Sequence, residues 1–168
     1  METRIKVLGH PVHPMLIVYP LGLFSTAVIF DVLYVITNND DLAVFSFWAI
    51  AAGLVGGLLA AVFGLIDFLA IPGTTRAKRV GMWHGGGNVL VVTLFAISWL
   101  MRLGDPTYLP SLGPLLPEVV AGGVALVTAW LGGELVYRLG VAVDQEANLN
   151  ASNSMEEAPI EVNPPGMS

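Results

Sequence analysis

The chain has 168 residues, of which 55% are hydrophobic and only 12% are charged. Ordinary soluble domains contain roughly 25% charged residues, so this composition is typical of a membrane protein. The formal charge of −6 comes largely from a C-terminal tail without Lys or Arg, and no basic surface for nucleic acid is indicated. The sequence contains no cysteine, which excludes disulfides, thiolate metal sites and an iron–sulfur cluster held by this chain alone.

Four apolar runs predict an all-α, polytopic membrane protein, because helices of roughly 20 apolar residues cross a bilayer. The predicted spans cover residues 15–36, 42–71, 80–103 and 118–141. The first run is longer than the apolar part of a signal peptide, so it is expected to remain as a span. Within it, Pro20 is expected to kink the helix.

Small residues predict that the second and fourth spans pack closely in a four-helix bundle, because such ladders let helix backbones approach. The residues at four-residue spacing are Gly53, Gly57 and Ala61 in the second span and Ala121, Ala125, Ala129 and Gly133 in the fourth. No internal repeat is apparent in the sequence.

The chain is expected to form one transmembrane domain, residues 1–143, followed by an acidic tail, residues 144–168. The tail is polar and has little to bury, so it is predicted to be disordered. A loop before the fourth span contains several prolines, which are expected to prevent a continuous helix up to residue 117. These prolines are Pro106, Pro110, Pro114 and Pro117.

The distribution of basic residues predicts that both termini are cytoplasmic, since cytoplasmic segments next to spans are enriched in Lys and Arg. In a four-span arrangement only Arg102 falls on the outer side. The residues on the side of the termini are Arg4, Lys6, Arg76, Lys78, Arg79 and Arg138.

Polar residues are expected to form one layer near the cytoplasmic end. At about 1.5 Å rise per residue, His84, Asp67 and Glu134 lie at nearly the same depth in their spans. His10 and His13 belong to a His-Pro-Val-His-Pro segment that enters the membrane at the same face and is expected to cover this layer. Neighbouring turns add Asn88 and Tyr137 as supporting residues.

The carboxylates of Asp67 and Glu134 could have a structural role instead of a functional one. Asp67 could bond Arg76 or Arg79, and Glu134 could pair with Arg138 four residues later. Residues this close to the membrane interface can also reach headgroups and water.

Three consecutive glycines follow His84, although glycine in a helix is less favourable than alanine by about 1 kcal/mol. Their presence indicates that either a packed helix or a flat porphyrin approaches the backbone there. His10 and His13 each precede a proline, which favours extended backbone and would place them roughly 9 Å apart in a polyproline helix. Either a sharper turn joins them or one of them pairs with His84.

Four motifs resemble one bacterial membrane family. They are GHPVHPML at residues 9–16, GLID at residues 64–67, His84 with Asn88, and WLGGELVY at residues 130–137. Over about residues 9–143 the chain is similar to the family called domain of unknown function 2231. The resemblance implies a four-helix protein of the bacterial inner membrane without an established activity. Relatives joined to Rieske-type domains suggest redox chemistry, although this chain has no cysteine for such a cluster.

The first functional hypothesis is a haem- or metal-binding module in membrane redox chemistry, working with a redox partner protein. Haem b would be held by His84 and by His10 or His13. A divalent metal would instead use these histidines together with Asp67 and Glu134.

The second hypothesis is a non-catalytic scaffold or accessory subunit, whose polar layer fixes helix packing and whose tail recruits a partner. The third is proton or ion permeation, for which four spans in the lipid bilayer are narrow unless the chain forms a homo-oligomer. Catalysis of the hydrolase kind is not indicated, because no serine or cysteine is set beside a histidine in a recognisable pattern.

Overall fold

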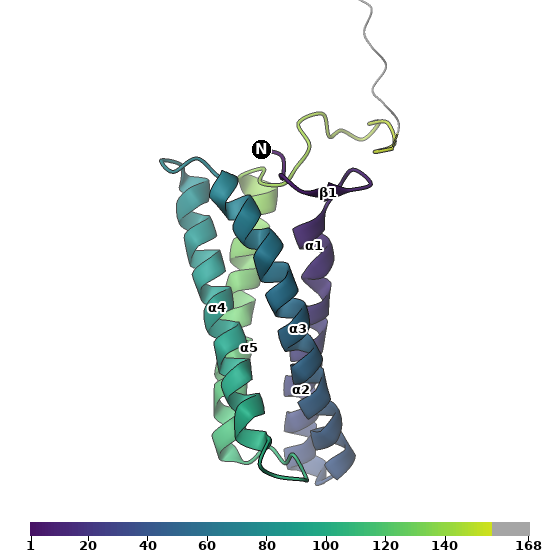
Figure 1. Ribbon diagram of the computed structural model, residues 1–168, viewed down its shortest axis with the longest axis vertical. Helices are drawn as coiled ribbons and strands as arrows, with labels where there is room; N and C mark the ends of the chain where they lie inside the picture. The colour runs from purple at the N-terminus through teal and green to yellow at the C-terminus, as the bar shows by residue number, and fades with distance from the viewer. Residues whose placement is uncertain (156–168) are drawn as a thin grey trace, which may run out of the picture.

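Four long helices run side by side in the computed structural model, which describes residues 1–155 (Figure 1). The first span is made of α1 (Val12–Leu16) and α2 (Val18–Thr37), the second of α3 (Asp40–Ala70), the third of α4 (Arg76–Arg102), and the fourth of α5 (Leu112–Gly133) continued by the π-helix η1 (Glu134–Arg138). All four are long and apolar enough to cross a membrane, which confirms the predicted number of spans. Of the predicted disordered tail, residues 156–168 lie outside the described residues.

Local sequence signals explain where the middle helices begin. The Asn39 side chain accepts a hydrogen bond from the backbone N–H of Asp41 at 3.1 Å, and the Thr75 hydroxyl accepts one from Lys78 at 3.1 Å. Both are N-cap arrangements, which satisfy amide groups that have no partner inside the helix. The Thr75 cap places the start of α4 at Arg76, four residues before the apolar run that predicted it.

Proline has different effects in the first and fourth spans. The break between α1 and α2 at Ile17 lies just before Pro20, which has no N–H to donate to the carbonyl of Leu16. By contrast, the prediction that no helix forms before residue 118 is wrong, because α5 already begins at Leu112. Pro114 lies in the first turn of α5, where a backbone N–H would have no acceptor inside the helix. Pro117 cannot donate to the carbonyl four residues earlier, so only one carbonyl near the start of α5 lacks its helical partner.

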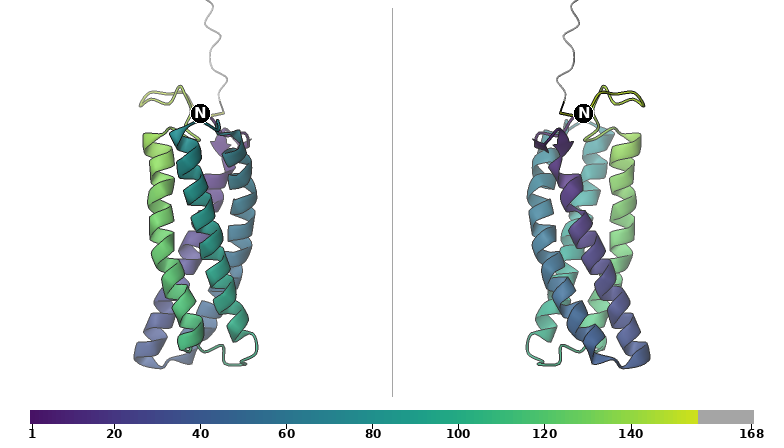
Figure 2. Two further views of the ribbon diagram at one scale, coloured as in Figure 1. Left: turned by 90° about the vertical axis from the view of Figure 1, so that its left-hand side faces the viewer. Right: turned by 90° about the vertical axis from the view of Figure 1, so that its right-hand side faces the viewer.

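The helices form two antiparallel hairpins that pack into one bundle, α1–α2 with α3 and α4 with α5 (Figures 1 and 2). The N-terminus and the segment that follows the fourth span therefore lie at the same end (Figure 1), where the Met1 ammonium donates a hydrogen bond to the Gly140 carbonyl at 2.9 Å. A small antiparallel ladder of β1 (Lys6–Val7) and β2 (His10–Pro11) lies at this end too. We call it the terminal end and the opposite one the far end.

The two hairpins repeat the same pattern of inward-facing residues, which sequence inspection did not detect. Each residue of the first helix has an equivalent 71 positions later, the separation that also joins Asp31 to Arg102. The equivalent pairs are His13 and His84, Pro20 and Val91, Phe24 and Phe95, Ala27 and Ser98, and Asp31 and Arg102. Few of these pairs keep the same residue type, so the repeat is visible in the burial pattern rather than in the letters.

The second span of each hairpin repeats in the same way, because buried positions of α3 are matched by buried positions of α5 and η1 that lie 68 residues later in the sequence. These pairs are Ser46 and Pro114, Ile50 and Glu118, Gly53 and Ala121, Ala60 and Thr128, and Asp67 and Leu135. The bundle is therefore pseudo-two-fold symmetric about an axis that runs along its length.

Equivalent aromatic rings meet at the centre of this arrangement. Phe24 and Phe95 stack with ring centroids 4.0 Å apart and an interplanar angle of 5°. Gly53 of α3 makes room for this pair, because a Cβ there would lie 2.6 Å from Phe24 Cε1. The small-residue ladder of α3 thus lets the two hairpins close on their aromatic centre.

The first prediction concerns this close approach. Gly53→Ala should lower the stability of the bundle by about 1–3 kcal/mol, because the new methyl group displaces a ring that is already stacked. Gly22→Ala is the matched control, since Gly22 also lies in a helix but has no atom within 4 Å of its missing Cβ. Thermal unfolding in detergent measures both. Equal melting temperatures for the two variants would contradict this account of the packing.

Candidate functional site

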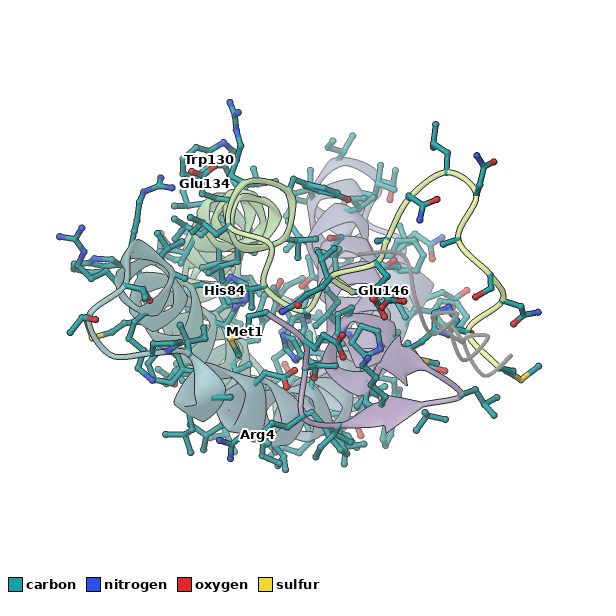
Figure 3. The ribbon with its side chains drawn as sticks, turned by 90° about the horizontal axis from the view of Figure 1, so that it is seen from above. Met1, Arg4, His84, Trp130, Glu134 and Glu146 are labelled. Carbon is teal, nitrogen blue, oxygen red and sulfur yellow. The ribbon has the colours of Figure 1, made fainter. Side chains whose placement is uncertain are left out.

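His84 of α4 lies between α4 and α5 and faces the inside of the bundle (Figure 3). Its Nδ1 is 2.9 Å from the carbonyl oxygen of Thr128, and its Nε2 is 3.2 Å from the Nδ2 of Asn88. A carbonyl oxygen only accepts, so Nδ1 carries the proton and Nε2 accepts from the amide. The Thr128 hydroxyl lies 3.0 Å from Asn88 Oδ1 and completes a closed network of these three residues.

His13 of α1 makes the equivalent contact in the other hairpin. Its Nδ1 lies 2.9 Å from the carbonyl oxygen of Ala60, the counterpart of Thr128. A glycine follows each of these carbonyls by one turn and faces the imidazole. A Cβ on Gly64 would lie 2.7 Å from His13 Cε1, and one on Gly132 would lie 3.1 Å from His84 Cε1. Each imidazole ring therefore packs directly against a glycine.

His13 and His84 occupy equivalent positions of the two hairpins near the terminal end, whereas His10 lies apart. Both side chains are half-buried, and each is hydrogen-bonded within its own hairpin. His10 lies in the exposed ladder, with its Nδ1 3.0 Å from the carbonyl oxygen of Leu8. Two histidines, one from each hairpin, form the inner layer at the terminal end.

Asp67 anchors the N-terminal segment to the end of α3. Its carboxylate accepts a hydrogen bond from the Thr3 hydroxyl and another from the backbone N–H of Arg4 at 3.2 Å. Residues 1–7 consequently cross this end of the bundle from Gly140 to Asp67, as Figure 3 shows from above. They provide the cover that the sequence predicted for the His-Pro-Val-His-Pro segment.

Glu134 and Tyr137 lie on the outer side of the bundle. Glu134 pairs with Arg76 at 2.5 Å and points outward from η1 (Figure 3). Tyr137 is 87% exposed. None of the ion pairs considered from the sequence forms: Glu134 contacts Arg76 instead of Arg138, and Asp67 bonds the N-terminal segment instead of an arginine side chain.

The five predicted metal ligands do not converge. Asp67, Glu134 and His10 each have separate partners, and within residues 1–155 no three histidine or acidic side chains are grouped so that they could hold a metal ion. Asn88 contacts His84, whereas Tyr137 contacts neither histidine. The remaining candidate at this end is the pair of histidines.

A second polar cluster lies at the far end and was missed from the sequence. Asp31, Arg102 and Glu118 come from α2, α4 and α5, and all three side chains are fully buried. Arg102 Nη2 contacts the Asp31 carboxylate and lies 2.7 Å from Glu118 Oε1. The sequence could have predicted this cluster, because its three ionisable residues lie at similar depth near the far ends of three different spans.

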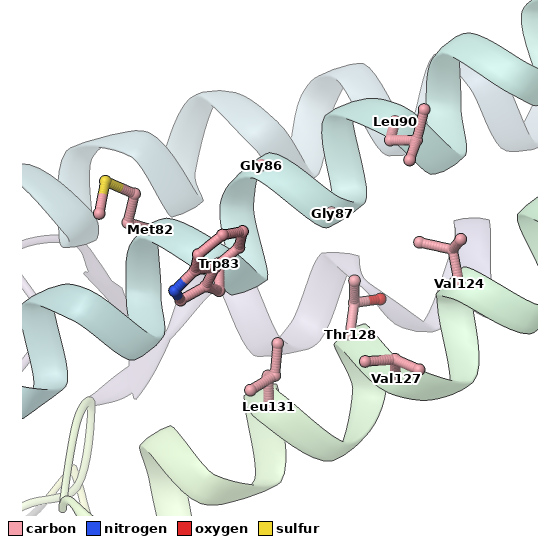
Figure 4. A pocket seen from close by; sticks show the side chains of 9 residues that line it. All are labelled: Met82, Trp83, Gly86, Gly87, Leu90, Val124, Val127, Thr128 and Leu131. Atoms are coloured by element: carbon pink, nitrogen blue, oxygen red, sulfur yellow. The ribbon is translucent and has the colours of Figure 1, made fainter.

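Two grooves mark the outer surface of the hairpins in equivalent places. The larger, of about 680 Å³, lies between α4 and α5, where Gly86 and Gly87 have no side chain to fill it (Figure 4). It is apolar and is bordered by Trp83, which is 71% exposed. The smaller groove, of about 270 Å³, lies between the first span and α3.

These features define a class of protein, a four-helix membrane bundle built from two equivalent hairpins with a polar site at each end. The family described as "Predicted membrane protein (DUF2231)" matches residues 9–145, and the chain belongs to this family. This confirms the resemblance found in the sequence. No curated protein and no solved structure matches the chain.

The second prediction tests the anchor of the N-terminal segment. Asp67→Ala removes the acceptor of two hydrogen bonds to a carboxylate, each worth about 1.5–3 kcal/mol. Tryptic cleavage after Arg4 and Lys6 should become at least about tenfold faster, as about 1.4 kcal/mol corresponds to a factor of ten. Glu134→Ala is the control, because its partner Arg76 is half exposed and does not hold this segment. Equal cleavage rates in the two variants would show that Asp67 is not the anchor.

Proposed function

We propose that this protein is a haem-binding module of the bacterial inner membrane, in which His13 and His84 would hold haem b. The observation that carries the proposal is the equivalent setting of the two imidazoles. Each one lies in the first span of a hairpin, donates its Nδ1–H to a carbonyl of the second helix of that hairpin, and packs against a glycine.

The Nδ1 contacts prepare both rings for ligation. A histidine that binds a metal through Nε2 commonly donates its other N–H to a carbonyl, which fixes the tautomer and the ring orientation and makes the ligand more basic. His13 Nε2 has no hydrogen-bond partner in the described chain. His84 Nε2 accepts only from Asn88, whose amide would have to turn away for this nitrogen to hold iron.

The position of the pair suits a cofactor held between hairpins. His13 and His84 come from opposite hairpins and are half-buried, whereas Ala60 and Thr128, to which they bond, are 4% and 3% exposed. Two imidazoles on facing helices are a usual haem ligand set in bundles, and the absence of cysteine excludes thiolate ligation.

Haem would supply one-electron transfer, and the chain would supply its position and surroundings. The two carbonyl contacts hold the imidazoles, and the stacked Phe24 and Phe95 close the bundle toward its centre. The N-terminal segment, tied to Gly140 and Asp67, covers the terminal end and limits the access of water.

The proposed orientation places this end in the cytoplasm, facing a redox partner protein. Five of the seven basic residues are exposed, and all five lie at the terminal end. Arg102, the one basic residue at the far end, is buried with two carboxylates and contributes no positive loop charge. The bias toward cytoplasmic termini is therefore stronger than the sequence alone indicated.

A non-catalytic scaffold is the second candidate, and one observation favours it. Both nitrogens of His84 already have partners within the chain, and the network with Asn88 and Thr128 joins α4 to α5. On this reading the polar layer fixes helix packing. His84→Ala would then lower stability without the loss of any cofactor.

The third prediction separates these functions through an absorbance spectrum. Protein purified from cells with an ample haem supply should show a Soret band and the shifted bands of reduced haem after dithionite. The band should be lost in His13→Ala and in His84→Ala. His10→Ala should keep it, because His10 lies outside the bundle.

Elemental analysis of the same samples provides the measure of iron and of other metals. Folded wild-type protein with neither a Soret band nor stoichiometric iron would overturn the haem proposal and leave the scaffold. A band that survives both His13→Ala and His84→Ala would overturn the assignment of the ligands.

A further inference from the structure

We propose that the far end of the bundle binds one proton, which the carboxyl groups of Asp31 and Glu118 share beside Arg102. This site is separate from the histidine pair and does not depend on the function proposed for it. Its ligand is a proton held on Asp31 Oδ1 or Glu118 Oε2.

The hydrogen-bond pattern leaves a place for this proton. Arg102 Nη2 donates to Asp31 Oδ2 and to Glu118 Oε1, and the Ser98 hydroxyl donates to the same Glu118 oxygen at 2.8 Å. The second oxygen of each carboxyl group, Asp31 Oδ1 and Glu118 Oε2, is buried without any partner. Buried carboxylate oxygens are normally hydrogen-bonded, so two unpartnered oxygens on neighbouring groups indicate a missing donor.

The two carboxyl groups are neighbours, because the same nitrogen, Arg102 Nη2, contacts Asp31 Oδ2 and lies 2.7 Å from Glu118 Oε1. Two ionised carboxylates cannot hydrogen-bond each other, because neither has a hydrogen to donate. When one of them is protonated, its O–H supplies the donor that is missing. The same arrangement gives carboxylate dyads in proteins one tightly held proton.

The charge of the cluster leads to the same result. The groups that face it are Asp31 from α2, Ser46 from α3, Ser98 and Arg102 from α4 and Glu118 from α5. Arg102 is always charged, so two ionised carboxylates would leave one uncompensated negative charge. The side chains of all three ionisable residues are 0% exposed, and an unpaired buried charge is strongly unfavourable. One bound proton makes the cluster neutral.

The site also lies across the interface between the hairpins. Asp31 belongs to the first hairpin, whereas Arg102 and Glu118 belong to the second, and Asp31 and Arg102 are equivalent positions of the repeat. The proton is therefore held where the two halves of the bundle meet, on the side opposite to the termini.

Infrared spectroscopy of the full chain in detergent tests the proposal. At pH 7 the wild type should show the carbonyl stretch of a protonated carboxylic acid, and the band should shift in D₂O. Because the proton is shared, Asp31→Asn and Glu118→Gln should each abolish it, as either leaves one carboxylate paired with Arg102. Asp67→Asn is the control and should keep the band, since Asp67 lies at the terminal end.

A wild-type spectrum without this band would overturn the proposal, and so would a band that survives either Asp31→Asn or Glu118→Gln. If these variants do not fold, Ser98→Ala takes their place, because it removes a donor to Glu118 without changing the charge. The band should then remain and move in frequency, and an unmoved band would place the acid elsewhere and overturn the assignment.

Discussion

The far end of this bundle has to compensate the buried positive charge of the Arg102 guanidinium. It stays charged at every pH of interest, and it lies where neither water nor headgroups reach it. Such a charge is tolerated only beside opposite charge, so Asp31 of α2 and Glu118 of α5 must come to it. The ends of three helices are fixed by this requirement, and Ser46 brings α3 to the same place. Packing of small residues and stacked rings then fills the bundle above it.

The two ends use the repeat of the hairpins in different ways. At the terminal end the equivalent positions hold the same residue, His13 and His84, and each is fixed within its own hairpin. At the far end they hold opposite charges, Asp31 and Arg102, which contact each other across the interface. The equivalent positions thus carry the same side chain from both hairpins at one end, and at the other end they form an ion pair that joins the hairpins.

The helices could be predicted because long apolar runs and helix caps act locally, whereas most contacts of the polar residues could not. Depth along the spans placed Asp67, His84 and Glu134 near one end, but depth does not say which way a side chain points, and Glu134 points outward. Asp67 bonds the N-terminal segment, whose path no periodicity reveals. Arg102 was read as a loop charge. The depth argument applied to the far end would have joined it to its carboxylates, since all lie near the ends of spans.

The opposite charges at equivalent positions also decide which hairpins can associate. Two copies of the first hairpin would bring Asp31 against Asp31 in a dry interface. This like-charged pairing is strongly unfavourable. The second hairpin instead brings Arg102 to Asp31 and gives its carboxylate an opposite charge. During synthesis the first hairpin enters the membrane before the second exists, and this charge difference keeps it from pairing with the same hairpin of a neighbouring chain.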